Sequence, residues 1–181
     1  METTHRDICV ATGVWLLQQY WCDLAAVEIA FATGIGDAIG ISSSPKKQSQ
    51  RLTLCECKRT RSDLLSDLRA KKLLKYEAEA THCILVATKE AYLWKQDKTK
   101  ADVLNDLKEK GLPDHWGIAV IEGSEITLLR KPKKIQALTQ EKKNEIVLRV
   151  AKSYCYKYLA QDPPRRKRKR SRRRRKRRYG K

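Results

Sequence analysis

The sequence has no run of about 18 uninterrupted apolar residues, the length that a membrane-spanning helix requires. Its most apolar stretch, close to the N-terminus, is interrupted by Gln18, Gln19, Asp23 and Glu28. The first residues also lack a basic segment followed by an apolar run and a cleavage site, the pattern of a secretory leader. We therefore expect neither a transmembrane helix nor a membrane partner, and we expect the protein to be intracellular.

Cys-x-x-Cys pairs and the other ligand spacings typical of zinc fingers are missing as well. Most of the six cysteines lie in apolar runs, where a free thiol behaves as a small hydrophobic side chain. The histidines His5, His82 and His115 show no partner spacing typical of a zinc site, so we expect structural roles for them. These patterns favour free thiols in a reducing compartment, either the cytoplasm and nucleoid or the nucleus.

Acidic residues are absent from positions 165–181, which hold 14 lysines and arginines. The whole chain has 40 basic and 21 acidic residues. Residues 1–164 therefore hold 26 basic and 21 acidic residues and carry a net charge of only +5. A segment this basic repels itself and has little apolar surface to bury, so we expect a disordered tail over residues 163–181. The tail residues predicted to bind nucleic acid are Arg165, Arg166, Lys167, Arg168, Lys169, Arg170, Arg172, Arg173, Arg174 and Arg175.

Binding by such a tail depends on charge and not on base sequence, because each neutralised phosphate releases counterions. The composition therefore predicts DNA as the partner, with RNA as the alternative polymer. A nuclear-localisation signal, or a tether to an acidic protein or lipid, would have the same composition. The oligomeric state stays open, although a homodimer is common among enzymes that cut both strands.

Residues 1–162 alternate between helical and strand patterns, as α/β proteins do. We expect helices at residues 8–33 (one long or two abutting helices), 62–80, 101–110 and from Thr139 onward. We expect strands at residues 37–42, 52–58, 83–87, 117–121 and 125–129. This order predicts an α/β domain over residues 1–162, with a mixed central sheet flanked by helices.

The predicted strand at residues 52–58 places a carboxylate and an ammonium group two positions apart near its end. Alternate side chains of a strand share a face, so Glu56 and Lys58 point one way while Cys55 and Cys57 point the other. Charged side chains are rarely buried unless they are paired or functional. On spacing alone, a cross-strand ion pair on the surface explains this Glu-x-Lys pattern as well as a site does.

Two further carboxylates favour the interpretation as a site. Asp37 opens the preceding strand and would approach Glu56 if the two strands pair, giving two hard oxygen ligands for Mg²⁺, with Mn²⁺ as a substitute. Glu28 lies in an otherwise apolar run, where a lone charge needs an explanation. Phosphodiester hydrolysis requires carboxylates that hold a divalent cation and a lysine beside them, so Lys58 completes the set.

This arrangement resembles the PD-(D/E)XK nuclease superfamily and, within it, the MmcB-like group of DNA-repair endonucleases. The resemblance covers roughly residues 26–159, through the segments AVEIAFATGIGDAIGIS, LCECKRTRSDLLSDLR, THCILVA and GIAVIEGSEITLLRKP. It implies a restriction-endonuclease-like fold, with residues 1–162 as the nuclease domain. The proline of the family name is absent, and Gly36 stands in its place.

The resemblance also implies a role for each site residue. Asp37 and Glu56 would bind Mg²⁺, Lys58 would serve catalysis, and Glu28 would complete the catalytic site from the first helix. Some members of the superfamily are catalytically silent, so the resemblance implies the fold more firmly than the activity.

Basic residues directly after the Glu-x-Lys pattern are candidates for phosphate binding. Arg59, Arg61 and Ser62 would lie at the start of the next helix, where guanidinium groups and free amides can hold phosphates. Lys71, Lys72 and Lys75, together with Tyr76, would line a substrate groove from the same helix. The alternative is ordinary helix capping by Ser62 and solvated basic side chains.

The sequence thus supports two hypotheses from different classes. The first is a divalent-metal-dependent DNA endonuclease in DNA repair or processing, with the tail tethering the substrate. The second is a non-catalytic nucleic-acid-binding or architectural protein that retains the nuclease scaffold. An RNA-directed nuclease or RNA-bound component is a third alternative, because an arginine-rich tail does not distinguish the polymers.

Overall fold

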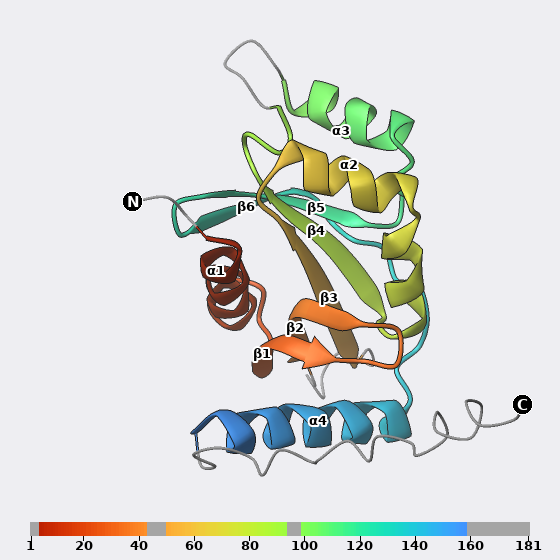
Figure 1. Ribbon diagram of the computed structural model, residues 1–181. Helices are drawn as coiled ribbons and strands as arrows, with labels where there is room; N and C mark the ends of the chain where they lie inside the picture. Colours follow the sequence, from red (N-terminus) through yellow and green to blue (C-terminus); the bar gives the residue numbers. More distant parts are fainter. Residues whose placement is uncertain (1–3, 43–49, 94–98, 159–181) are drawn as a thin grey trace, which may run out of the picture.

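The computed structural model describes residues 4–42, 50–93 and 99–158, which form a six-stranded sheet flanked by helices (Figure 1). The strands are β1 (Leu24–Ala30), β2 (Ile35–Ser42), β3 (Arg51–Lys58), β4 (His82–Thr88), β5 (Gly117–Glu122) and β6 (Glu125–Arg130). The helices are α1 (His5–Gln18), α2 (Arg61–Arg69), the 3₁₀ helix η1 (Lys72–Ala78), α3 (Lys100–Glu109) and α4 (Gln140–Tyr158). The predicted tail, residues 163–181, lies outside the described residues.

The strands follow one another across the sheet in chain order, from β1 to β6. The ladders β3–β4 and β4–β5 are parallel, and the other three ladders are antiparallel. The α/β architecture with a mixed sheet flanked by helices, expected from the sequence, is therefore confirmed. The hairpin expected between residues 37–42 and 52–58 is also present, as the antiparallel pair β2–β3.

The two faces of the sheet bury two separate apolar clusters (Figure 1). One face packs against α2, η1 and α3, and the cluster there includes Leu54, Leu64 and Val103. The opposite face packs against α1, and that cluster includes Cys55 and Cys57, as the alternation along β3 predicts. The middle five residues of β4 are buried, which fits a central strand covered on both faces.

The helix expected at residues 8–33 is wrong in its second half, because the chain from Leu24 onward forms the edge strand β1. Helix α1 ends at Gln18, and Trp21, whose φ is 58°, lies in the turn that follows. Residues 24–32 are almost uniformly apolar, so their periodicity does not distinguish a helix from a strand. Pairing with β2 decides the outcome, because the ladder from the pair Leu24–Ile41 to the pair Ala30–Ile35 holds this segment extended.

The helix expected at residues 62–80 is interrupted in the structure. Helix α2 ends at Arg69, Lys71 adopts a left-handed conformation with φ 51°, and the chain continues as η1. The N-cap of α2 is Thr60, whose hydroxyl accepts a hydrogen bond from the backbone N–H of Asp63, and not Ser62. The break redirects the chain so that Lys72 approaches the end of β3.

Within the described part of the chain, every helix is too short or too polar to cross a lipid bilayer.

Candidate active site

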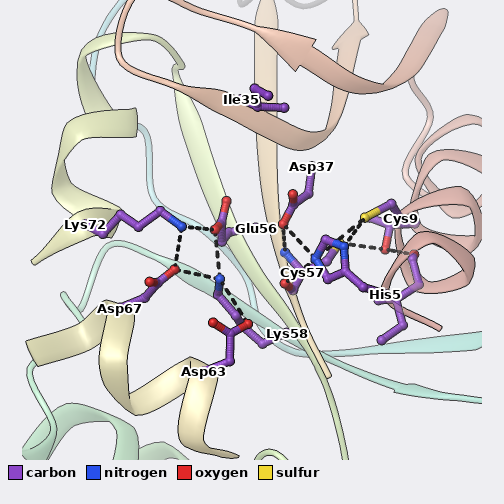
Figure 2. Close-up of polar contacts among 12 residues, drawn as sticks. His5, Cys9, Ile35, Asp37, Glu56, Cys57, Lys58, Asp63, Asp67 and Lys72 are labelled. Atoms are coloured by element: carbon purple, nitrogen blue, oxygen red, sulfur yellow. Dashed lines mark hydrogen bonds and ion pairs between the residues drawn. The ribbon is translucent and has the colours of Figure 1, made fainter. Parts of the chain in front are cut away.

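The site lies where β2 begins and β3 ends. Ala38 pairs with Cys55 in the antiparallel register, so the next position brings Asp37 opposite Glu56 on the same face of the sheet. The backbone N–H of Cys57 donates a hydrogen bond of 2.8 Å to Oδ2 of Asp37, which fixes that carboxylate at the crevice between the strands (Figure 2). Asp37, Glu56 and Lys58 line one pocket of about 580 Å³.

Lys58 is buried in a network of carboxylates, with only 3% of the residue exposed. Its Nζ lies 3.0 Å from Oε1 of Glu56 and 2.6 Å from Oδ2 of Asp67 (Figure 2). The half-exposed Asp63 is 3.5 Å away. Lys72 adds a second ammonium group, which lies 2.9 Å from Oδ2 of Asp67 and 3.6 Å from Oε1 of Glu56. Helix α2 thus places two carboxylates, and η1 one ammonium group, around the end of β3.

Burial and neighbouring charge shift the pKa values in this network. Burial raises the pKa of Glu56 and the Asp37 carboxylate raises it further, although Lys58 and Lys72 act in the opposite direction. Burial disfavours the charged form of Lys58, but its contacts with Glu56 and Asp67 outweigh burial and raise its pKa. The contact with Glu56 therefore stabilises the charged form of Lys58. The two ammonium groups do not fully offset burial and Asp37, so the pKa of Glu56 stays raised.

One carboxylate oxygen of the network has no hydrogen-bond partner among the described residues. Oε2 of Glu56 is buried, and no hydrogen bond reaches it from the residues that the structure describes. Oε1 of the same carboxylate already accepts from Lys58. A buried carboxylate oxygen without a donor is costly, unless a cation or a water completes its environment. The pocket, the facing Asp37 carboxylate and this oxygen together fit a hard divalent cation.

Glu28 reaches the same pocket, but from a different element than expected. The expectation that it extends from the first helix is wrong, because Glu28 lies in β1, between Val27 and Ile29, which pair with Ala38 and Gly36 of β2. Its φ is 55°, a left-handed conformation that a residue other than glycine adopts at some cost. The backbone at this position departs from regular strand geometry where the side chain lines the pocket.

The glycine at position 36, directly before Asp37, has a structural reason. A Cβ at Gly36 would lie 2.8 Å from Cε2 of Phe31 and 3.3 Å from Cδ1 of Leu54. The aromatic ring of Phe31 thus occupies the space beside Gly36, which directly precedes Asp37. Any larger residue at position 36 would displace the ring and with it the start of β2.

The predicted phosphate-binding residues divide into two groups. Lys72 lines the pocket, whereas Arg61 turns toward α3, where its guanidinium group lies 2.6 Å from Asp106. Arg59 and Ser62 are exposed beside the first turn of α2, and Lys71 is exposed before η1. The predicted residues Arg165 to Arg175 of the tail lie outside the described residues. Nucleic-acid contact stays a prediction for all of these residues.

Several residues of the site were not anticipated from the sequence. Asp63 and Asp67 of α2 surround Lys58, and no motif in the sequence marks them. Lys75 and Tyr76, which were expected beside Lys71 and Lys72, do line the pocket, and a substrate groove there stays a prediction. His5 also lines the pocket from the first turn of α1, although it was assigned a structural role. The spacing of His5 and Cys9 could have indicated a site, because residues four positions apart lie on the same face of a helix.

Comparison with known proteins gives a fold and no function. No protein-family model matches the chain, and no curated protein matches it either. Among solved structures, a protein of unknown function from Silicibacter pomeroyi is similar in fold, with a TM-score of 0.60 and 14% sequence identity. The match covers 87% of this chain and 90% of that one. At this identity the likeness supports the architecture of the domain alone.

Proposed function

We propose that the protein is a divalent-metal-dependent DNA endonuclease with a restriction-endonuclease-like domain, acting in DNA repair or processing. The observation that carries the proposal is Oε2 of Glu56, a buried carboxylate oxygen without a hydrogen-bond partner among the described residues. It belongs to a pocket that also holds the Asp37 carboxylate and the Lys58 network. This is the combination of groups that metal-assisted phosphodiester hydrolysis requires.

The donors fit a Mg²⁺ ion held by Asp37 and Glu56, with Glu28 facing the same pocket. The hydrogen bond from the Cys57 amide orients the Asp37 carboxylate. A bound Mg²⁺ would polarise the scissile phosphate and lower the pKa of a bound water. It would also compensate the negative charge that the two carboxylates bring together; burial first, and the Asp37 carboxylate second, raise the pKa of Glu56.

The chain's own basic groups surround that position. Glu56 and Asp67 hold the Lys58 ammonium group in place, so that it can orient a water or stabilise charge that develops on the phosphate. Lys72 and Lys75 line the same pocket and would contact the nucleic-acid backbone on either side of the scissile bond. The tail would add affinity that is independent of sequence.

The architectural alternative also has an observation in its favour. Lys58 and Lys72 are both paired with Asp67, so the described network holds its two ammonium groups without any ligand. A scaffold that has lost activity could keep such a network as a structural ion cluster. In that case the tail would account for binding, and the pocket would take no part in it.

The test is cleavage of labelled single-stranded, duplex, nicked, flapped and branched DNA, with matched RNA, in Mg²⁺, Mn²⁺ or EDTA. The nuclease proposal predicts that at least one DNA substrate is cut, that EDTA abolishes the product and that added Mg²⁺ restores it. Binding of all substrates by tail-dependent contacts, with no product under any condition, would support the architectural alternative instead.

A further inference from the structure

We propose that His5, Cys9 and Asp37 form a second cation site, which takes a thiophilic divalent metal of the Zn²⁺ class. One imidazole nitrogen, one thiol sulfur and one carboxylate oxygen from these residues all lie within 4.8 Å of one another. The site adjoins the pocket of the Mg²⁺ ligands but uses a different donor set. Neither the resemblance nor the proposed nuclease chemistry requires it.

The geometry comes from one helix turn and one strand. His5 and Cys9 are four residues apart in α1, so their side chains lie one above the other on the same face. Sγ of Cys9 is 3.9 Å from Nε2 of His5, and Nε2 is 3.5 Å from Oδ2 of Asp37 (Figure 2). Ligand atoms at the usual zinc distances are about 3.5 Å apart in a tetrahedral site. The three donors therefore need only small shifts to share one ion.

A fourth oxygen lies beside the same nitrogen. The backbone carbonyl of Cys57 is 3.1 Å from Nε2 of His5, an interaction in which the imidazole donates a proton when no metal is present. A metal at Nε2 would take the place of that proton, which would move to Nδ1 of the neutral imidazole, and the Cys9 thiol would release its proton to bind as a thiolate. The carbonyl or a water would then complete the coordination. Entry is available through His5, whose side chain is 47% exposed and lines the pocket.

The donor set decides which metal binds. Mg²⁺ prefers oxygen ligands and gains little from a thiolate, whereas Zn²⁺ and Co²⁺ bind imidazole and thiolate strongly. Glu56 and Asp37 on one side of the crevice thus suit a hard cation, and Cys9 and His5 on the other side suit a soft one. Asp37 belongs to both sets, so the two sites are coupled; this coupling rests on the proposed function, whereas binding of the soft metal does not.

The test uses Co²⁺ as a spectroscopic probe on full-length, tag-free, reduced protein. Cobalt bound by a thiolate gives an intense charge-transfer absorption in the near ultraviolet, which bound Mg²⁺ cannot give. We expect this absorption to saturate at one equivalent of Co²⁺ and to disappear when Zn²⁺ is added. Absence of the absorption in the wild-type protein would overturn the proposal.

Variants identify the donors. Cys9→Ala should lose the absorption, while Cys57→Ala and the exposed Cys155→Ala should keep it. His5→Ala should weaken Co²⁺ binding by at least about tenfold, and it leaves the core intact because His5 is half exposed. An absorption that survives in Cys9→Ala but is lost in Cys57→Ala would contradict the assignment. Wild-type affinity in His5→Ala would contradict it even if Cys9→Ala fails to fold.

Mg²⁺ separates this proposal from the nuclease proposal. If Asp37 serves both sites, saturating Mg²⁺ should shift the Co²⁺ midpoint of the wild-type protein but not that of Glu56→Gln. A Co²⁺ signal that depends on Cys9 but ignores Mg²⁺ supports the soft-metal site and counts against Asp37 as a Mg²⁺ ligand.

Discussion

Nζ of Lys58 lies 2.6 Å from Oδ2 of Asp67, so that a buried salt bridge joins the end of β3 to α2. Lys58 is the last residue of the Glu-x-Lys pattern in the sequence, whereas Asp67 lies in α2 and belongs to no sequence motif. The contact shows that the lysine is positioned from both elements. It also means that α2 belongs to the candidate site and does more than cover the sheet.

Loss of Asp67 should therefore destabilise the fold. In Asp67→Ala, Lys58 keeps Glu56 as its buried partner, but the balance of charge around the two ammonium groups is lost. Removing one partner costs about 3–5 kcal/mol when the other charge is left uncompensated, and about 1–3 kcal/mol is expected here because Glu56 still pairs with Lys58. Urea unfolding should show a loss of this order for Asp67→Ala and less than about 1 kcal/mol for the half-exposed Asp63→Ala. Equal effects of the two changes would contradict the network described here.

Gly36 should not tolerate even a methyl group. The Cβ of Gly36→Ala would lie 2.8 Å from the ring of Phe31, and overpacking of this kind costs about 1–3 kcal/mol. Smaller side chains at position 31 should relieve the clash, so Phe31→Leu is expected to cost less in the Gly36→Ala background than in the wild type. A double-mutant cycle measured by thermal unfolding checks this coupling, and strictly additive effects would show that the ring is not the obstacle.

Acid should destabilise the fold through His82. Burial, together with the charges of Arg51 and Lys134, lowers the pKa of His82 from 6.5 to about 4. Between these values the unfolded chain binds a proton that the folded chain does not, so the free energy of unfolding falls as the pH drops from about 6.5 to about 4. The decline should be shallower in His82→Asn. Parallel pH profiles of the two proteins would rule out this contribution.

The tail should dominate the salt dependence of DNA binding. Each phosphate contact contributes about 0.9 to the slope of log affinity against log salt. If the tail makes about six such contacts, truncation after Asp162 should reduce the slope by about 5 and weaken binding to all sequences alike. Fluorescence anisotropy over a range of salt concentrations measures both quantities. An unchanged slope would place the phosphate contacts on the domain instead.

The sequence predicted the parts of the structure that depend on short-range patterns. Alternation along residues 52–58 placed Glu56 on one face of the sheet and Cys55 on the other, as the structure has them. The strand at residues 24–30 was missed because a uniformly apolar run has no distinguishing period, and a neighbouring strand decides its conformation.

The candidate site was only partly predictable for a similar reason. Asp37 and Glu56 could be brought together because a hairpin fixes their register. Lys72 reaches the site through the left-handed residue Lys71, which separates α2 from η1, and no local pattern indicates that break. Asp67 reaches it because α2 packs beside the end of β3. His5 arrives from another layer of the fold, so its distance from Asp37 follows from the packing of α1 on the sheet.

The measurement that tests the central claim most directly is the single-turnover rate of phosphodiester cleavage by wild-type protein and Glu56→Gln at saturating Mg²⁺. Glu125→Gln, at an exposed position in β6, is the matched control. A metal held by Glu56 contributes several kcal/mol, so Glu56→Gln should cut roughly 10³-fold more slowly while binding the same DNA with wild-type affinity. Glu125→Gln should cut at the wild-type rate. Equal cleavage by Glu56→Gln and the wild type would contradict the proposed site.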